Sequence, residues 1–153
     1  MNKFILYQNK KILYRISGTG KPVILIHGFG EDGNVWNNQV EFFKDNLSAS
    51  KTGFQLIVPD LPGTGQSAMI DDMSMEGMAE VIHSIIHEEN IDSCPVIGHS
   101  MGGYILLALM EKYWNHVSAF GLFHSSSFAD SEEKIATRRK GIEFIEQNGA
   151  APF

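Results

Sequence analysis

The chain has 153 residues, of which 43% are hydrophobic and 20% are charged, which is enough to form one domain with a sizeable core. Twelve Lys and Arg residues against 18 Asp and Glu residues give a formal net charge of −6. This acidic balance argues against a basic surface that tracks phosphates, so we expect no nucleic-acid partner.

The first residues predict neither export nor membrane insertion. The apolar run at 4–7 is too short for the core of a signal peptide, and no stretch approaches the roughly 20 apolar residues of a membrane span. Cys94 is the only cysteine, so no internal disulfide is expected. We therefore expect a cytoplasmic protein that has no membrane partner.

The N-terminal third predicts a hairpin followed by buried strands. Residues 4–8 and 12–17 are short β-prone runs separated by the polar residues 9–11, which favours an antiparallel hairpin at a sheet edge. Residues 23–26 and 56–58 are continuous rather than alternating apolar runs. Such runs are typical of parallel strands that are buried on both faces.

Two more strands and three helices follow. The strands are expected at 96–97 and 117–123, and helical segments separate successive strands. An amphipathic helix is expected at about 74–90, and a helix apolar on all sides over 105–110, which should lie beneath further structure. A last helix is expected at about 131–147. The alternation predicts an α/β fold with a mostly parallel sheet flanked by helices.

The most informative motif is GHSMG at 98–102, which matches G-x-S-x-G. It lies between the apolar run at 95–97 and a helical run that starts near Tyr104. In a sharp strand-to-helix turn, glycines two positions either side of a serine allow close packing and leave its hydroxyl exposed. We therefore predict that Ser100 is a catalytic nucleophile.

A second motif, HGFG at 27–30, follows the apolar strand 23–26. It therefore falls at the carboxyl end of a parallel strand, where α/β sheets bind ligands. Such a turn directs a backbone N–H toward the negative charge that develops during attack by a nucleophile. We predict that the backbone N–H groups of Phe29 and Met101 form an oxyanion hole. The simpler interpretation, a turn that only ends a strand, remains open.

With DLPGTGQS at 60–67, these motifs and their order resemble the α/β-hydrolase superfamily, in its serine esterase-like and peroxidase-like branch. The resemblance covers the N-terminal portion of that fold. It implies a mostly parallel sheet with a lid inserted after the sixth strand, and we expect the fold to be truncated here after that strand and the first lid helix. Residues 1–130 would form the hydrolase core, and residues 131–153 the start of the lid (cap) segment, including its first helix.

The resemblance also implies a triad acid and a histidine after the nucleophile, in that order. After Ser100 the only histidines are His116 and His124, and the only aspartate is Asp130. The serine, acid, histidine order therefore cannot be assembled, and the chain alone is expected to be nearly inert. A makeshift triad that uses His124 and Asp130 is the less favoured alternative.

Cofactor and metal chemistry are weakly indicated. Residues 63–68 match G-x-G-x-x-A, but no helix begins there, and Asp71 and Asp72 would repel a pyrophosphate. His83 and His87 are four residues apart, yet no third ligand is apparent. We expect neither a cofactor nor a metal.

The sequence thus predicts a serine hydrolase that acts on a carboxylic ester or a related small acyl substrate. We hypothesise that Trp36 and Phe128 line an apolar acyl pocket together with the side chains of Phe29 and Met101. The acyl and alcohol groups are open, as is the choice among esterase, perhydrolase, thioesterase and carbon–carbon hydrolase activity.

Two alternatives compete with this interpretation. In the first, the chain is a clipped or truncated fragment that a second polypeptide completes, or that self-associates through the exposed edge of the sixth strand. In the second, it is a ligand-binding module with a hydrolase-like pocket and no turnover.

Overall fold

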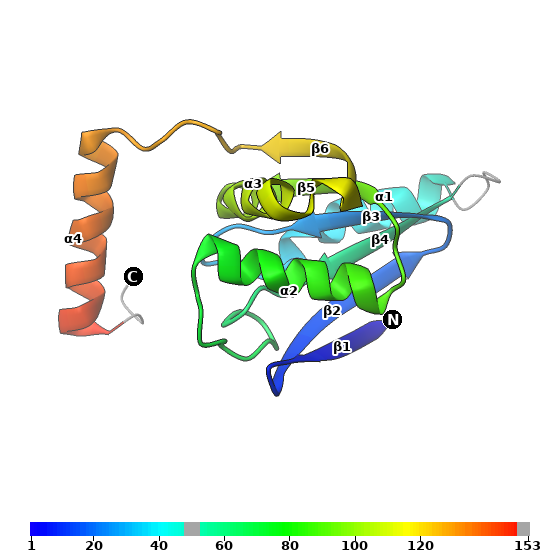
Figure 1. The fold of residues 1–153 in the computed structure, drawn as a ribbon, viewed down its shortest axis with the longest axis horizontal. Coiled ribbons are helices and arrows are strands. Elements are labelled where there is room, and N and C mark those ends of the chain that lie inside the picture. Colours follow the sequence, from blue (N-terminus) through cyan, green and yellow to red (C-terminus); the bar gives the residue numbers. More distant parts are fainter. Residues whose placement is uncertain (48–52, 150–153) are drawn as a thin grey trace.

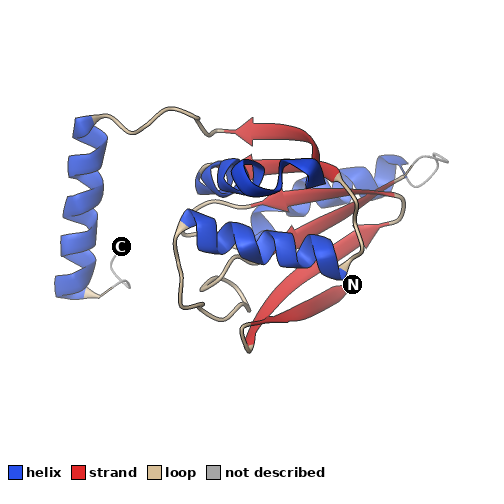
Figure 2. Cartoon of the chain, in the orientation of Figure 1, coloured by secondary structure: helices blue, strands red, loops and turns tan. Residues whose placement is uncertain are grey.

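A computed structural model describes residues 1–47 and 53–149 as a six-stranded sheet with helices on both faces (Figures 1 and 2). The strands are β1 (Asn2–Tyr7), β2 (Lys10–Gly18), β3 (Lys21–Ile26), β4 (Phe54–Pro59), β5 (Cys94–His99) and β6 (Val117–Phe123). The helices are α1 (Asn37–Leu47), α2 (Met75–Glu88), α3 (Met101–Tyr113) and α4 (Glu132–Asn148), with short 3₁₀ turns η1 (Gly33–Trp36) and η2 (Trp114–His116).

The sheet order is β1-β2-β4-β3-β5-β6. Strands β4, β3, β5 and β6 run parallel, whereas β1 and β2 form an antiparallel hairpin whose second strand pairs with β4. The hairpin turns at Gln8 and Asn9, both with positive φ, which is the geometry that matches the twist of paired strands. These observations confirm the predicted fold class.

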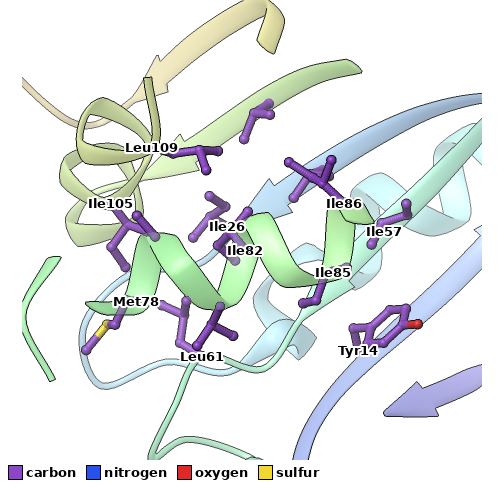
Figure 3. Packing of buried hydrophobic residues seen from close by; sticks show 14 of the residues in the cluster. Tyr14, Ile26, Ile57, Leu61, Met78, Ile82, Ile85, Ile86, Ile105 and Leu109 are labelled. Carbon is purple, nitrogen blue, oxygen red and sulfur yellow. The ribbon is translucent and has the colours of Figure 1, made fainter. Parts of the chain in front are cut away.

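Helices α2 and α3 cover one face of the sheet, and α1 covers the other (Figure 1). Strand β3 shows why both faces are apolar: Ile24 and Ile26 belong to the core beneath α2 and α3, while Val23 and Leu25 belong to the opposite core. The apolar stripe of α2 lies over the sheet, with Ile82, Ile85 and Ile86 almost fully buried (Figure 3). The continuous apolar runs of the sequence are thus explained by burial on both sides.

Helix α3, expected to lie beneath other structure, packs on the sheet beside α2, and its residues Leu107, Ala108 and Met110 are only partly buried. Its residues Ile105, Leu106 and Leu109 are completely buried. The start of α3 approaches the backbone of β3 so closely that a Cβ at Gly102 would lie 2.5 Å from the carbonyl oxygen of Ile26. Glycine at this position therefore allows the helix to begin against the sheet.

The loop that follows β4 is organised by the buried carboxylate of Asp60. Its Oδ1 accepts a hydrogen bond from the N–H of Gly33 at 3.0 Å, and its Oδ2 accepts one from the N–H of Gln66 at 3.0 Å. The hydroxyl of Ser67 donates to the carbonyl of Asp60 at 2.7 Å and accepts from the N–H of Leu13 at 2.9 Å. The loop is thereby tied to β2 and to η1.

Cys94 lies in the core and is 1% exposed. Burial raises the pKa of its thiol to about 11, because the charged thiolate is poorly solvated there. This environment is that of a small core residue rather than a reactive thiol.

Helix α4 stands apart from the sheet at the end of an extended segment (Figure 1), and none of its residues is buried. Ser131 caps its first turn by accepting a hydrogen bond from the N–H of Lys134. Asp130 pairs with Lys134 at 2.9 Å and with Arg138 at 2.7 Å. In the part of the chain that the structure describes, no helix is long and apolar enough to cross a membrane.

The close approach at Gly102 predicts that Gly102→Ala will destabilise the fold by about 1–3 kcal/mol, because the added methyl group meets backbone rather than a movable side chain. Urea denaturation measures the change. The matched control is Gly121→Ala, whose Cβ would make ordinary contacts with Ile97 beginning at 3.4 Å. Equal stabilities of the two variants would contradict the prediction.

The role of Asp60 predicts that Asp60→Asn will lower the free energy of unfolding by about 1.5–3 kcal/mol, because a single amide oxygen cannot replace both carboxylate acceptors. Asp71→Asn, which removes the same charge at an exposed position, is expected to change the free energy of unfolding by less than about 0.5 kcal/mol. Thermal and chemical denaturation of both variants will compare them. A wild-type value for Asp60→Asn would show that the loop does not depend on this carboxylate.

Candidate functional site

Ser100 occupies the sharp turn between β5 and α3. Its backbone has φ 50° and ψ −116°, a conformation that costs a residue with a side chain about 1–3 kcal/mol unless its surroundings hold it. The surroundings come from the end of β6: the N–H of Ser100 donates to the carbonyl of Phe123 at 3.0 Å, and the hydroxyl of Ser125 donates to the carbonyl of Ser100 at 2.8 Å. Such a turn presents the serine side chain at the carboxyl edge of the sheet.

The turn after β3 lies directly against this serine. A Cβ at Gly28 would be 3.1 Å from the Cβ of Ser100 and 3.2 Å from Nδ1 of His99. The two sequence motifs, 71 positions apart at His27 and Gly98, therefore meet because β3 and β5 are adjacent and parallel. A Cβ at Gly28 would force these neighbours to move by a few tenths of an ångström, so glycine suits the junction.

Two backbone donors are unoccupied at this junction. Within residues 1–47 and 53–149, neither the N–H of Phe29 nor that of Met101 donates a hydrogen bond. Met101 is the first residue of α3, so its N–H belongs to the group that a helix leaves unpaired at its positive end. Two unpaired amides beside a serine can in principle stabilise an oxygen that gains negative charge.

His27 braces the base of the turn. It is fully buried, and its Nε2 accepts a hydrogen bond from the N–H of Leu61 at 3.0 Å. The hydrogen of the neutral ring therefore lies on Nδ1, which donates to the carbonyl of Gly28 at 2.8 Å. Burial lowers the pKa of His27, because the charged ring would lose its hydration, and this favours the neutral form.

The structure also reveals Glu31, which the sequence analysis did not single out. Its Oε2 accepts a hydrogen bond from the N–H of Gly28 at 2.7 Å and lies 2.9 Å from Nδ1 of His99. Burial raises the pKa of Glu31, but these two hydrogen bonds and the electrostatic influence of His99 and His27 together outweigh burial, and the net pKa is lowered. The only available signal in the sequence was a carboxylate directly after HGFG.

The structure does not bring Trp36 and Phe128 together. Trp36 is 5% exposed and packs in the core on the α1 face, with its ring centroid 6.0 Å from that of Phe123 and 6.4 Å from that of His99. Its buried Nε1 has no hydrogen-bond partner among the described residues. Phe128, in the segment after β6, is 85% exposed.

His124 and Asp130 do not form a triad with Ser100. Asp130 pairs with Lys134 and Arg138, and the ring of His124 contacts the rings of Phe123 and His99. Across the described ranges, the hydroxyl of Ser100 has no hydrogen bond to any histidine. The contacts that the structure shows for His124 and Asp130 thus join them to neighbours other than Ser100.

The other sequence motifs have structural surroundings of their own. His83 stacks on Tyr113 with ring centroids 3.7 Å apart, and the described residues contain no group of three side chains suited to a metal. Residues 63–65 line a hollow of about 540 Å³ together with 30–32 and Val35, and the nearest following helix, α2, begins only at Met75. A dinucleotide site at a helix N-terminus is therefore not formed by this loop.

Comparison with known proteins places these features in one family. The family described as "alpha/beta hydrolase fold" matches residues 21–141. The chain is 34% identical over 131 residues to Lipase 1 of Psychrobacter immobilis, covering 80% of this chain and 38% of that protein. It is 36% identical over 116 residues to Lipase 3 of Moraxella sp. (strain TA144), covering 72% of this chain and 33% of that protein.

Among solved structures, a thermophilic esterase from Thermogutta terrifontis superimposes with a TM-score of 0.82 at 29% identity, covering 99% of this chain and 55% of that one. The chain thus spans between a third and about half of the length of these relatives. The family match extends over most of the chain, and the esterase structure superimposes on nearly all of it. The chain belongs to the α/β-hydrolase family.

Proposed function

We propose that this chain supplies the nucleophile and oxyanion hole of a serine hydrolase that acts on a carboxylic ester or a related small acyl substrate. The observation that supports the proposal most is the close approach of the turn after β3 to Ser100, together with the unpaired N–H groups of Phe29 and Met101. Names among the similar proteins, two lipases and an esterase, support an ester as substrate.

In the proposed reaction, the Ser100 hydroxyl oxygen attacks the carbonyl carbon of the substrate and gives up its proton to a base. The negative charge on the carbonyl oxygen is stabilised by the N–H groups of Phe29 and Met101, each typically worth about 3–4 kcal/mol in the transition state. The alcohol departs with a proton, leaving an acyl group on Ser100. Water then releases this group as a carboxylic acid and restores the serine.

The proposal requires a base that the described residues do not place at Ser100. A serine hydroxyl without such a base is a weak nucleophile, and loss of triad members leaves only about 10³–10⁴-fold catalysis over water. We propose that a further polypeptide segment carries the histidine and the acid and joins the sheet at β6. Strand β6 is the last strand in the sheet order and bears no charged residue, so its free side can accept another strand.

The apolar contacts for the acyl group are assigned to Phe29, Met101 and Phe128. Phe29 is 67% exposed beside the oxyanion turn, and Phe128 extends from the segment after β6. Trp36 supports the site by packing against His99 and Phe123 rather than by lining an open surface.

Helix α4 would belong to a lid over this site. A reducing, cytoplasmic location is proposed from the lone buried Cys94.

A ligand-binding module without turnover is the competing function, and it would use the same turn. The unpaired amides of Phe29 and Met101 would then hold an anionic or carbonyl ligand with no covalent step at Ser100. Covalent labelling distinguishes the two functions, because only an activated serine forms an adduct.

The proposed function predicts that an alkyl fluorophosphonate will add covalently to Ser100, slowly in the chain alone and faster when imidazole is present, because imidazole replaces the absent histidine base. Intact-mass spectrometry measures the adduct. Ser100→Ala is the control and is expected to remain unlabelled with and without imidazole. Equal labelling of the wild type and Ser100→Ala, or no labelling of either, would contradict the proposed serine chemistry.

A further inference from the structure

We propose that Glu31 is a positioning residue that fastens the oxyanion turn to the nucleophile turn and leaves the N–H of Phe29 free for substrate. This inference rests on the proposed function, since it assigns a task within the same site. It concerns the carboxylate one residue beyond HGFG, which no sequence motif includes.

A single oxygen atom makes the connection. Oε2 of Glu31 accepts a hydrogen bond from the N–H of Gly28, in the turn after β3, and contacts Nδ1 of His99, at the end of β5. Both partners adjoin the reacting groups: Gly28 precedes Phe29, and His99 precedes Ser100. The three groups converge on one point, because a Cβ at Gly28 would lie 3.0 Å from Oε2 of Glu31, 3.1 Å from Ser100 Cβ and 3.2 Å from His99 Nδ1.

The charge state of Glu31 agrees with this task. A carboxylate only accepts hydrogen bonds, so Nδ1 of His99 carries the hydrogen in this contact. Although burial raises the pKa of Glu31, the hydrogen bonds from Gly28 and His99 and the electrostatic influence of His99 and His27 together lower it more, which favours the ionised acceptor. The His99 ring is also flanked by the rings of Trp36 and Phe123, so its orientation is fixed from two directions.

Occupation of the Gly28 amide determines which amide of the turn stays available. Glu31 uses the N–H of Gly28, while the N–H of Phe29 is unpaired in the described part of the chain. Without the carboxylate, the Gly28 amide would be unsatisfied in a half-buried turn, and the peptide would be free to rotate. The donor position beside Ser100 is then lost even though the fold persists, because small displacements of a positioned group reduce rates strongly.

The neighbouring Asp32 provides a matched control. Its side chain accepts a hydrogen bond from the N–H of Asn34 at 2.8 Å and caps η1, and within the described residues no hydrogen bond joins it to Gly28 or His99. Asp32→Asn removes one negative charge at the adjacent position while retaining a good capping residue. Any effect of charge alone would therefore appear in this variant as well.

The experiment measures the reaction of an alkyl fluorophosphonate with the full chain in the presence of imidazole, separating the maximal rate kinact from the binding constant KI. In Glu31→Ala we expect kinact to fall roughly ten- to hundredfold with KI changed by less than about twofold, because donor placement affects the reacting state more than binding. Glu31→Gln is expected to stay within about fivefold of the wild type, since its amide oxygen can accept the same two hydrogen bonds. Asp32→Asn should react like the wild type.

Nuclear magnetic resonance of the Gly28 amide separates the possible failures. The short bond to Glu31 is expected to shift this amide proton downfield in the wild type and in Glu31→Gln, but not in Glu31→Ala. If the amide shifts as expected and Glu31→Ala keeps the wild-type kinact, the positioning role is overturned while the proposed function stands. A wild type that shows no labelling overturns the proposed function, and the positioning role with it. An unchanged Gly28 amide in Glu31→Ala overturns the contact itself.

Discussion

The approach of the turn after β3 to the turn after β5 is the contact on which the rest of the site depends. Neither turn has a chemical use alone, because a serine needs a place for the developing charge and unpaired amides need a reacting atom beside them. Adjacent parallel strands bring both turns to the same edge of the sheet. Gly28 and Gly102 permit the final approach, since a Cβ at Gly102 would collide with the backbone of β3 and a Cβ at Gly28 would crowd Ser100 and His99.

Three polar side chains, those of His27, Asp60 and Glu31, hold the segments around that contact. His27 connects it to the loop after β4 through the N–H of Leu61, and Asp60 connects this loop to η1. Glu31 joins the two turns directly, because its carboxylate contacts both Gly28 and His99. Each of these is a polar group removed wholly or partly from water and satisfied by backbone partners, which is the condition under which buried polar groups stabilise rather than disrupt a fold.

Much of this architecture could be predicted from the sequence because burial leaves a strong pattern. The continuous apolar runs at β3 and β4 indicated parallel strands, and the amphipathic stripe of α2 indicated a helix on the sheet. The placement of Trp36 and the contacts of Glu31 could not be predicted in the same way. The apolar ring of Trp36 suits a pocket or a core equally well, so its burial in the core could not be foreseen. The partner of Glu31 is His99, which lies 68 residues away in the sequence.

The attachment of Ser100 to β6 links the candidate site to the local stability of the sheet edge. Ser100 is held in its strained backbone conformation by Phe123 and Ser125, which lie at the end of a strand that is paired on one side only in the described sheet. Edge elements open more often than the interior of a sheet, and their opening is measured by hydrogen exchange. Opening of β6 breaks the hydrogen bonds that hold the Ser100 backbone, so hydrogen exchange at this strand also reports how often the conformation of the serine turn is lost.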